Sequence, residues 1–348
     1  MTPTPASGPT CDAVDAATSR HADPLCRRDA SSLKTLPFVT RSMNRRSVAG
    51  GVVAGVGAVA LANAALRQQA PPLEPALDGT QRTFEWNDID VRYAEAGDPD
   101  DPDLVLLPGI NAAGSNGEFR AVFDDLADDY HVVSPDLPGF GMSDRPPLRY
   151  SASLYTEFVR AFLAEFDAPA VVASSITAAY LLDAAPDLDL SSVVLICPTE
   201  RGGPDRNLPA RELLRSPVIG EALFNLLTSK PSIRYFNADH GYYDTDRVSE
   251  AWIDYEWRTA HQPNARYAPA SFISGFLNAD VDLEAALRDV DSVTLLWGRE
   301  AEITPLSRGR DLAEAADCRL VVVDDAKLLP HVEFPQQVLW VLDEALDG

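Results

Sequence analysis

Short apolar runs alternate with stretches of helical spacing beyond residue 80, and this alternation most constrains the fold. The apolar runs have the length of strands, and Pro108-Gly109 ends the first of them. Strands that alternate with helices indicate a parallel sheet covered on both faces, because parallel strands need long crossovers. The expected strands are a hairpin over 84–96 and the runs 104–107, 131–133, 170–173, 193–197, 293–297 and 320–323. The expected helices are 118–127, 155–166, 178–185, 305–316 and 336–346.

A long segment at about 198–278 interrupts this alternation. It carries leucines at helical spacing, followed by an aromatic stretch over 235–257. Helices inserted at this point would lie over the ends of the strands. We therefore expect a helical lid within a main domain that covers residues 81–348, preceded by a short proline-containing linker over 68–80.

The N-terminal part of the chain shows a different composition. Residues 1–42 are rich in Pro, Ser, Thr, Ala and Asp, so we expect them to be disordered, and Met43 is an alternative start. Within 43–67, the run 48–66 has 19 residues without a charge, close to the length that spans a bilayer. Three interpretations stay open: an uncleaved membrane anchor, a cleaved export signal, and a soluble helix.

Two local features bear on where this segment places the main domain. The pair Arg45-Arg46 precedes the apolar run, as in twin-arginine signals. An Ala-x-Ala cleavage pattern is present at Ala60/Ala62 or Ala62/Ala64. Basic residues on the N-terminal side of an anchor or a signal indicate that the main domain lies outside the cytoplasm. A cytoplasmic location is the alternative, and membrane association would use 48–66.

The charge balance excludes several classes of partner. The chain has 53 acidic and 29 basic residues, a formal net charge of -24. Such a surface repels nucleic acid and anionic lipid. Lysine is rare, which together with the acid excess suggests adaptation to high salt. The four cysteines show no metal-ligand spacing, so we expect neither a metal site nor a disulfide framework, and we expect no cofactor.

Several motifs then follow one another along the chain in a fixed order. They are Leu-Leu-Pro-Gly-Ile-Asn at 106–111, Asp-Leu-Pro-Gly-Phe-Gly-Met-Ser at 136–143, Ala-Ser-Ser-Ile-Thr at 173–177, Trp-Gly at 297–298 with Ile-Thr-Pro at 303–305, and Pro-His-Val-Glu-Phe-Pro at 330–335. On these motifs the chain resembles the α/β-hydrolase superfamily over roughly residues 82–346. The resemblance implies an α/β-hydrolase fold, a mostly parallel doubly wound sheet with a helical lid insertion.

The motif at 173–177 corresponds to the nucleophile elbow of that superfamily. An elbow needs small residues around its serine because strand and helix approach closely there. Ala173 satisfies this requirement, whereas Thr177 replaces the glycine that usually follows. In this register Ser175 lies at the apex and is the candidate nucleophile. The alternative is that Ser174 and Ser175 only end a strand and cap a helix.

The resemblance also implies an oxyanion hole built from backbone N–H groups. The donors would belong to Ile176, next to the serine, and to Ile110 in the preceding loop. Pro108 replaces the histidine of the superfamily's loop, which leaves these backbone donors unchanged.

The two ionisable partners of the serine are missing from their usual positions. Ala301 aligns with the acid and Leu328 with the histidine of the superfamily. Glu302 is the nearest candidate for the acid. His331, three residues late, is the candidate base, and its alternative role is a structural histidine packed near Glu333.

Two functions from different classes fit this pattern. The first is a lid-covered serine hydrolase for a small or lipid-like carboxylic ester, with a displaced base supplied by His331, or by His240 or His261 in the lid. The second is a non-catalytic binder that holds an apolar ligand or partner under the lid, since both replacements exchange a polar group for an apolar one.

Overall fold

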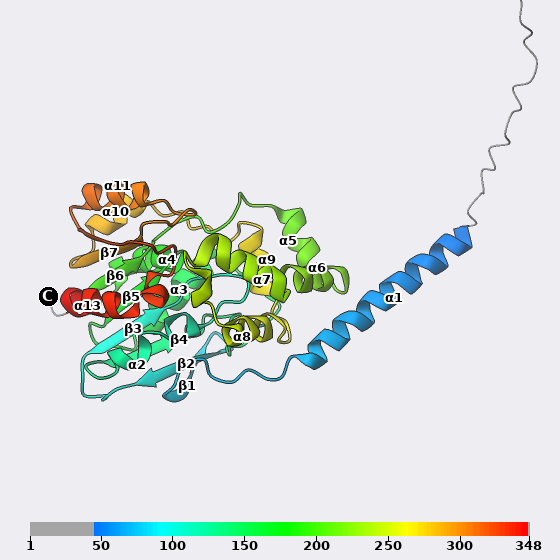
Figure 1. The fold of residues 1–348 in the computed structure, drawn as a ribbon, viewed down its shortest axis with the longest axis horizontal. Coiled ribbons are helices and arrows are strands. Elements are labelled where there is room, and N and C mark those ends of the chain that lie inside the picture. The colour runs from blue at the N-terminus through cyan, green and yellow to red at the C-terminus, as the bar shows by residue number, and fades with distance from the viewer. Residues whose placement is uncertain (1–44, 347–348) are drawn as a thin grey trace, which may run out of the picture. The chain divides into compact units, whose positions relative to one another are not determined.

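An eight-stranded sheet lies at the centre of the structure, a computed structural model that describes residues 45–346 (Figure 1). The predictions for residues 1–42 and for a start at Met43 fall outside the described residues. The strand order is β1-β2-β4-β3-β5-β6-β7-β8. The strands are β1 Thr80–Trp86, β2 Ile89–Ala96, β3 Asp103–Leu107, β4 His131–Pro135, β5 Ala170–Ser174, β6 Val193–Ile196, β7 Val293–Gly298 and β8 Arg319–Val323.

The sheet is mixed at one edge and parallel elsewhere. Strands β1 and β2 form an antiparallel hairpin, whose turn residues Asn87 and Asp88 both have positive φ, as a two-residue type I′ turn requires. Strand β2 also runs antiparallel to β4. The six strands from β4 to β8 in spatial order are parallel. The expected hairpin and the mostly parallel sheet are thus confirmed.

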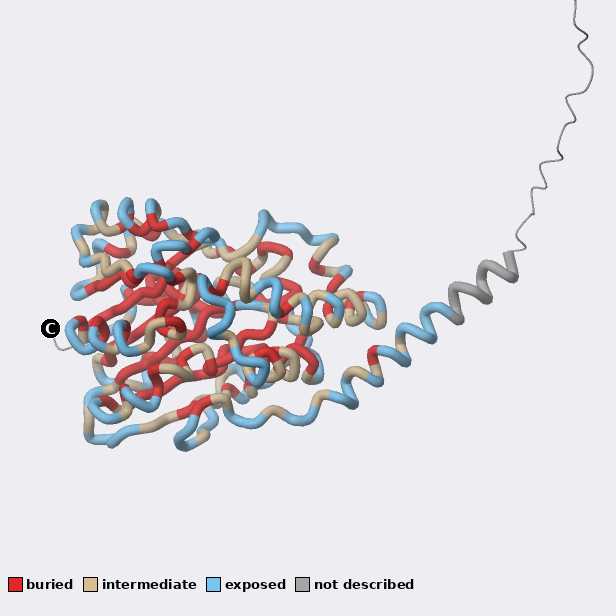
Figure 2. Tube along the Cα trace, viewed as in Figure 1, coloured by how far each residue is buried: buried red, intermediate tan, exposed pale blue. Residues whose placement is uncertain are grey.

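Both faces of the sheet are buried, as Figure 2 shows by the continuous red of the central strands. Successive residues of β3 point to opposite sides: Val105 and Leu107 join one apolar cluster, and Leu104 and Leu106 join the other. Helices α3, α4, α10 and α11 cover the first face, and α2 and α13 cover the second. This two-sided burial explains why the strands read as unbroken apolar runs.

Helices occupy the connections between the strands. They are α2 Phe123–Leu126, α3 Ala152–Leu163, α4 Thr177–Ala184, α10 Leu283–Arg288, α11 Leu306–Ala316, α12 Pro330–Glu333 and α13 Pro335–Leu346, with short turns η1 Asn116–Phe119 and η2 Ala185–Asp187. The single helix expected over 118–127 is instead the tight turn η1 followed by α2. Tertiary bonds shape this segment: Asn116 N–H donates to Asp136 Oδ1 over 2.7 Å, and Gly109 N–H donates to Glu118 Oε2 over 2.9 Å.

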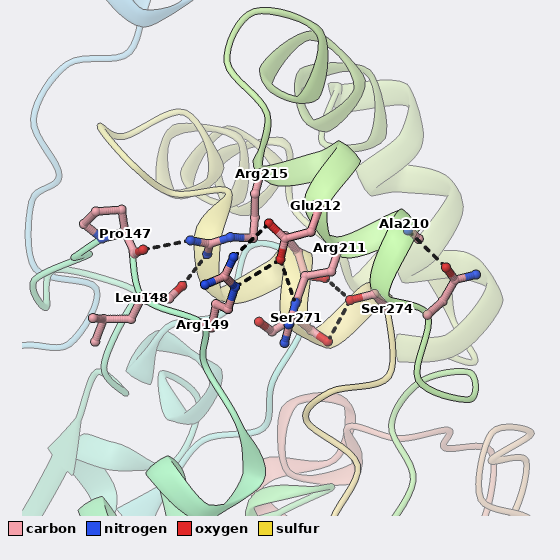
Figure 3. Close-up of polar contacts among 11 residues, drawn as sticks. Pro147, Leu148, Arg149, Ala210, Arg211, Glu212, Arg215, Ser271 and Ser274 are labelled. Carbon is pink, nitrogen blue, oxygen red and sulfur yellow. Dashed lines mark hydrogen bonds and ion pairs between the residues drawn. The ribbon is translucent and has the colours of Figure 1, made fainter.

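A set of helices is inserted between β6 and β7, as the sequence predicts for the lid. They are α5 Leu208–Arg215, α6 Ile219–Leu227, α7 Lys230–Phe236, η3 Asn237–Gly241, η4 Thr245–Arg247, α8 Glu250–Ala260 and α9 Tyr267–Ile273. Helix α5 is tied to the loop after β4 (Figure 3). Arg149 Nε lies 3.1 Å from Glu212 Oε1, and Arg215 donates to the carbonyls of Pro147 and Leu148.

The apolar run 48–66 lies within α1, Arg45–Gln69. No helix in the described part of the chain has both the length and the apolar character that crossing a bilayer requires, so the transmembrane prediction lacks support. The run consists mostly of Gly, Ala and Val, which carry little apolar surface. Asn63 is buried, donates to Val218 O over 2.8 Å and accepts from Asn225 Nδ2 over 3.1 Å. A polar side chain of α1 is therefore satisfied by residues at and within α6.

The loop after β4 is built around a buried carboxylate. Asp136 accepts hydrogen bonds from Asn116 N–H and Met142 N–H, both over 2.7 Å. Gly141 lies against this carboxylate with φ of +48°, and a Cβ at this position would come within 1.9 Å of the Asp136 side chain. The glycine is thus required both by backbone conformation and by space.

We predict that Gly141→Ala lowers the free energy of unfolding by about 2 kcal/mol or more, because the added methyl group forces the loop away from Asp136. Urea unfolding followed by circular dichroism measures this change. The matched control is Gly55→Ala in α1, where a Cβ meets nothing within 4 Å. Equal stability of the two variants would contradict this account of the loop.

Candidate active site

The turn between β5 and α4 carries Ser175 at its apex. Ser175 has φ of +55°, a backbone conformation that residues other than glycine rarely adopt. Ser175 is half-buried, whereas Ser174 is buried. The strained turn is held from both sides: Ser175 N–H donates to Ile196 O over 2.8 Å, and Ser175 O accepts from Thr199 N–H over 3.3 Å. Backbone strain that neighbouring bonds maintain marks a position where side-chain placement matters.

The loop after β3 lies beside this turn, because β3 and β5 are adjacent and parallel, with Leu107 paired to Ala173. Thr177, which replaces the second glycine of an elbow, donates its hydroxyl to Pro108 O over 2.7 Å. This bond ties the start of α4 to the loop. The two expected oxyanion donors lie on these segments: Ile110 in the loop and Ile176 directly before α4, both with buried side chains.

A buried carboxylate, Glu118, joins the loop to the elbow. Its Oε2 accepts from Gly109 N–H over 2.9 Å, and its carboxylate also forms a hydrogen bond with the Ser174 side chain. Only 11% of the Glu118 side chain is exposed. Burial raises the pKa of Glu118 above its usual range, and the bonds from Ser174 and Gly109 partly oppose this rise.

His331 lies on the other side of the same carboxylate. Its Nε2 is 3.5 Å from Glu118 Oε1, and its ring packs against Phe119 with 5.2 Å between the centroids. The side chain is fully buried. Burial, together with the positive charge of Arg120, lowers the pKa of His331 to about 3, so the imidazole is neutral at physiological pH.

The remaining sequence-predicted partners lie elsewhere. The side chain of Glu302 is 72% exposed, and its carboxylate is 3.6 Å from Lys327 Nζ. Ala301 is buried, and Leu328 packs against the edge of an apolar cluster. The structure therefore brings His331 to Glu118 and Glu302 to Lys327, and the catalytic roles of His331 and Glu302 stay predictions.

Glu333, which follows the histidine in α12, anchors this segment to the lid. Its fully buried carboxylate accepts from Tyr243 N–H over 2.9 Å, from Asp244 N–H over 3.0 Å and from Lys327 N–H over 3.1 Å. Helix α12, which carries His331, is thus joined to the inserted helices by hydrogen bonds from Tyr243 N–H and Asp244 N–H to the Glu333 side chain.

The two lid histidines each have another partner. His261 is buried, its Nδ1 lies 2.7 Å from Trp257 O, and its ring stacks on the Trp257 ring at 4.3 Å between centroids. His240 is partly exposed, with Nδ1 3.0 Å from Asp239 Oδ2. These contacts account for both side chains as parts of the lid.

Arg120, whose positive charge acts on Glu118, makes contacts with the lid. Arg120 donates to Tyr242 OH over 2.8 Å, and its guanidinium lies 3.7 Å from the centre of the Trp252 ring. Farther into the lid, Glu256 accepts from Asn237 Nδ2 over 2.6 Å. Burial raises the pKa of Glu256 to about 7, while Arg120 acts in the opposite direction.

Sequence patterns do not single out Glu118. It is one of 53 acidic residues and lies in a segment that reads as an ordinary helix. The signal that could have found it is its position a few residues after the loop that ends β3, since such loops gather at one edge of a parallel sheet.

Comparisons with known proteins agree with this architecture. The sequence model of the Alpha/beta hydrolase family matches residues 104–339, which is more than half of the chain. The chain belongs to the alpha/beta hydrolase family. The α/β-hydrolase fold expected from the motifs is thereby confirmed.

Two curated hydrolases match parts of the sequence. An uncharacterized hydrolase, YNR064C, of Saccharomyces cerevisiae is 40% identical over 58 residues, and epoxide hydrolase A of Mycobacterium tuberculosis is 37% identical over 68 residues. These matches cover 17% and 19% of this chain, and the chain spans only 19% and 20% of the length of these relatives.

Solved structures of alpha/beta hydrolases share the fold over nearly their whole length. A 2-hydroxy-6-oxo-6-phenylhexa-2,4-dienoate hydrolase from Rhodococcus sp. superimposes with a TM-score of 0.64 at 21% identity, covering 78% of this chain and 100% of that one. A bacterial membrane phospholipase A superimposes with a TM-score of 0.60 at 21% identity, covering 88% and 99%. At these identities the likeness concerns the fold alone.

We predict that Thr177→Val lowers the free energy of unfolding of this hydrolase-family chain by about 1–3 kcal/mol, because the buried Pro108 carbonyl loses its donor. Thr177→Ser is the matched control, since it keeps the hydroxyl. Urea unfolding of both variants measures the difference. Equal losses in the valine and serine variants would show that the hydroxyl contributes nothing.

We predict that Glu256→Gln changes how stability depends on pH. With a folded-state pKa of about 7, Glu256 holds a proton in the native state that the unfolded chain releases near its ordinary pKa of 4.5. The free energy of unfolding therefore falls as pH rises through this window. The glutamine variant loses this slope and gains, relative to the parent chain, at most about 3 kcal/mol above pH 7.

Chemical unfolding at about pH 5 and about pH 8 tests this prediction. Glu157→Gln, at an exposed position of α3, serves as the control and is expected to show no such gain. A stability difference between Glu256→Gln and the parent chain that is the same at both pH values would refute the assignment of this slope to Glu256.

Proposed function

We propose that this chain is a serine hydrolase that cleaves small or lipid-like carboxylic esters, with Ser175 as the nucleophile. The observation that carries the proposal is the strained conformation of Ser175, whose φ of +55° is maintained at the apex of the turn between β5 and α4. A serine held in this way presents its hydroxyl beyond the end of the strand, where a substrate carbonyl can reach it.

The surroundings of Ser175 support an acyl-transfer reaction. The backbone N–H groups of Ile176 and Ile110 are the proposed oxyanion donors, and donors of this kind favour the charge that develops on the carbonyl oxygen. In this proposal His331 belongs to the acid–base group of the site through its contact with Glu118. Glu302 remains the alternative carboxylate. Its side chain is more exposed than that of Glu118 and contacts Lys327, and both facts argue against a role beside Ser175.

The lid and the family bear on the substrate class. The inserted helices α5–α9 contribute apolar side chains. The solved structures with the same fold include a membrane phospholipase A, a 2-hydroxy-6-oxo-6-phenylhexa-2,4-dienoate hydrolase and a serine hydrolase involved in carbazole degradation. We propose an apolar or ester ligand under the lid for this chain. Membrane association through 48–66 and a location outside the cytoplasm stay proposals that rest on the sequence.

A non-catalytic binder is the second candidate function, and one observation favours it. His331 is fully buried, and neither ring nitrogen has a hydrogen-bond partner within normal geometry among the described residues. A histidine in this state does not deliver protons to solvent-facing groups by itself. Under this alternative, Ser175 marks an elbow that holds a ligand without attacking it.

We predict that a fluorophosphonate probe labels Ser175 and that the chain hydrolyses p-nitrophenyl butyrate, both through attack by the Ser175 hydroxyl. In Ser175→Ala labelling disappears and ester hydrolysis falls by at least about 100-fold. The readouts are gel fluorescence and nitrophenolate release.

The control is Ser153→Ala, an exposed serine on α3, which should leave labelling and hydrolysis unchanged. Labelling that persists in Ser175→Ala would show that another residue is the nucleophile. A parent chain that neither reacts with the probe nor hydrolyses the ester would instead support the binder.

A further inference from the structure

We propose that Glu118 is the catalytic acid–base residue of this site, so that the carboxylate, rather than a histidine, exchanges protons with Ser175. This inference rests on the proposed function and names the group that the replacements at Ala301 and Leu328 leave unassigned. In the order of groups proposed here, the carboxylate lies between the serine turn and the histidine.

The position of Glu118 relative to the elbow follows from Gly109. A Cβ built on Gly109 would lie 3.2 Å from Glu118 Oε2, 3.3 Å from Ser174 Oγ and 3.3 Å from Ser175 Cβ. The carboxylate oxygen and the Ser175 side chain therefore flank the same small space. This space exists because residue 109 is glycine. Glu118 Oε2 and Ser175 Cβ lie 3.2 Å and 3.3 Å from the same point, and one bridging water is the proposed path for the proton between Oε2 and the Ser175 hydroxyl.

Three contacts hold the carboxylate in this place. Gly109 N–H donates to Oε2 over 2.9 Å, the Ser174 side chain forms a hydrogen bond with the carboxylate, and His331 Nε2 lies 3.5 Å from Oε1. Oε1 has no hydrogen-bond partner within normal geometry among the described residues. Oε2, the oxygen beside the serine turn, is thus fixed by the backbone, and Oε1, which faces His331, has unused accepting capacity.

The charges around Glu118 suit a group that gains and loses a proton. Its burial favours the protonated form, whereas the positive charge of Arg120 favours the carboxylate. The other titratable groups that face it are His331, neutral at physiological pH, and Tyr242 from the lid. A general base works best when its pKa lies near the operating pH, and burial moves the pKa of Glu118 in that direction.

The proposed reaction consumes only the ester and one water. As Ser175 Oγ bonds to the ester carbonyl carbon, its proton passes to Glu118; the carbon–oxygen bond to the alcohol then breaks, and Glu118 returns the proton to the leaving oxygen. Next, a water gives one proton to Glu118 while its oxygen bonds to the acyl carbon. The bond to Ser175 breaks and its oxygen recovers the proton, so ester and water become alcohol and carboxylic acid.

The test compares three glutamate-to-glutamine variants of the full chain. Glu118→Gln is expected to slow p-nitrophenyl butyrate hydrolysis and fluorophosphonate labelling by about 100-fold or more, within the range that a positioned acid–base group supplies. Glutamine keeps an oxygen that can accept from Gly109 N–H, so circular dichroism should show a folded protein. Glu157→Gln is the exposed control and should retain the parent rates.

The pH profile of the parent chain gives a readout that needs no variant. Because Glu118 acts as a base in its ionised form, the hydrolysis rate should rise with pH as this carboxyl loses its proton, measured from about pH 4 to about pH 9. The rise should be absent from the residual rate of Glu118→Gln.

The outcomes separate this inference from the proposed function. If Ser175→Ala is inactive but Glu118→Gln keeps the parent rate, or if the parent profile shows no rise with pH, Glu118 is not the base and the serine hydrolase stands. Loss of activity in Glu302→Gln with retention in Glu118→Gln would assign the carboxylate role to Glu302. A parent chain without any labelling or hydrolysis overturns both proposals.

Discussion

The burial of both faces of the parallel sheet is the constraint on which the rest of this structure depends. Alternate side chains of β3, β5, β6 and β7 enter two separate apolar clusters, one beneath α3 and α4 and the other beneath α2 and α13. Each fully buried aliphatic side chain contributes about 1.5–3 kcal/mol, so the register of these strands is strongly determined. With the register set, Leu107 lies beside Ala173, and the loops that follow both strands meet at one edge.

The loops after β3 and β5 lie side by side, and polar side chains occupy this region next to the apolar clusters. The strained Ser175 is kept in place by backbone bonds to Ile196 and Thr199, and the cost of the strain is about 1–3 kcal/mol. Glu118 is tolerated in the same region because Gly109 and Ser174 bind its carboxylate and Arg120 lies nearby. The site therefore combines a rigid serine with a carboxyl group whose protonation depends on its surroundings.

The inserted helices complete this region and link it to the rest of the domain. Arg120 reaches Tyr242 in the lid, and Glu333 binds backbone N–H groups of Tyr243 and Asp244. A movement of the lid would accordingly disturb the neighbours of both Glu118 and His331. The position of the lid and the surroundings of Glu118 and His331 are therefore linked through these contacts.

The strand positions could be predicted because two-sided burial leaves a local signature. The apolar runs at 104–107 and 170–173 fall within β3 and β5, and the turn at 173–177 places Ser175 at its apex as the motif predicts. The prediction of one continuous helix over 118–127 was wrong. Hydrogen bonds from Asn116 N–H to Asp136 and from Gly109 N–H to Glu118 accompany a tight turn at the start of this segment. The helix propensity of the residues in this segment gives no information about these tertiary bonds.

The sequence by itself determined the fold family and the serine turn, because both depend on motifs of contiguous residues. Only the tertiary structure decided which ionisable groups meet there. Glu118 and His331 are separated by more than two hundred residues and come within 3.5 Å of each other, whereas Glu302, adjacent to Ala301 in sequence, contacts Lys327. Which ionisable side chains lie near one another depends on how the sheet brings distant loops to one edge. The spacing of residues along the sequence does not predict this arrangement.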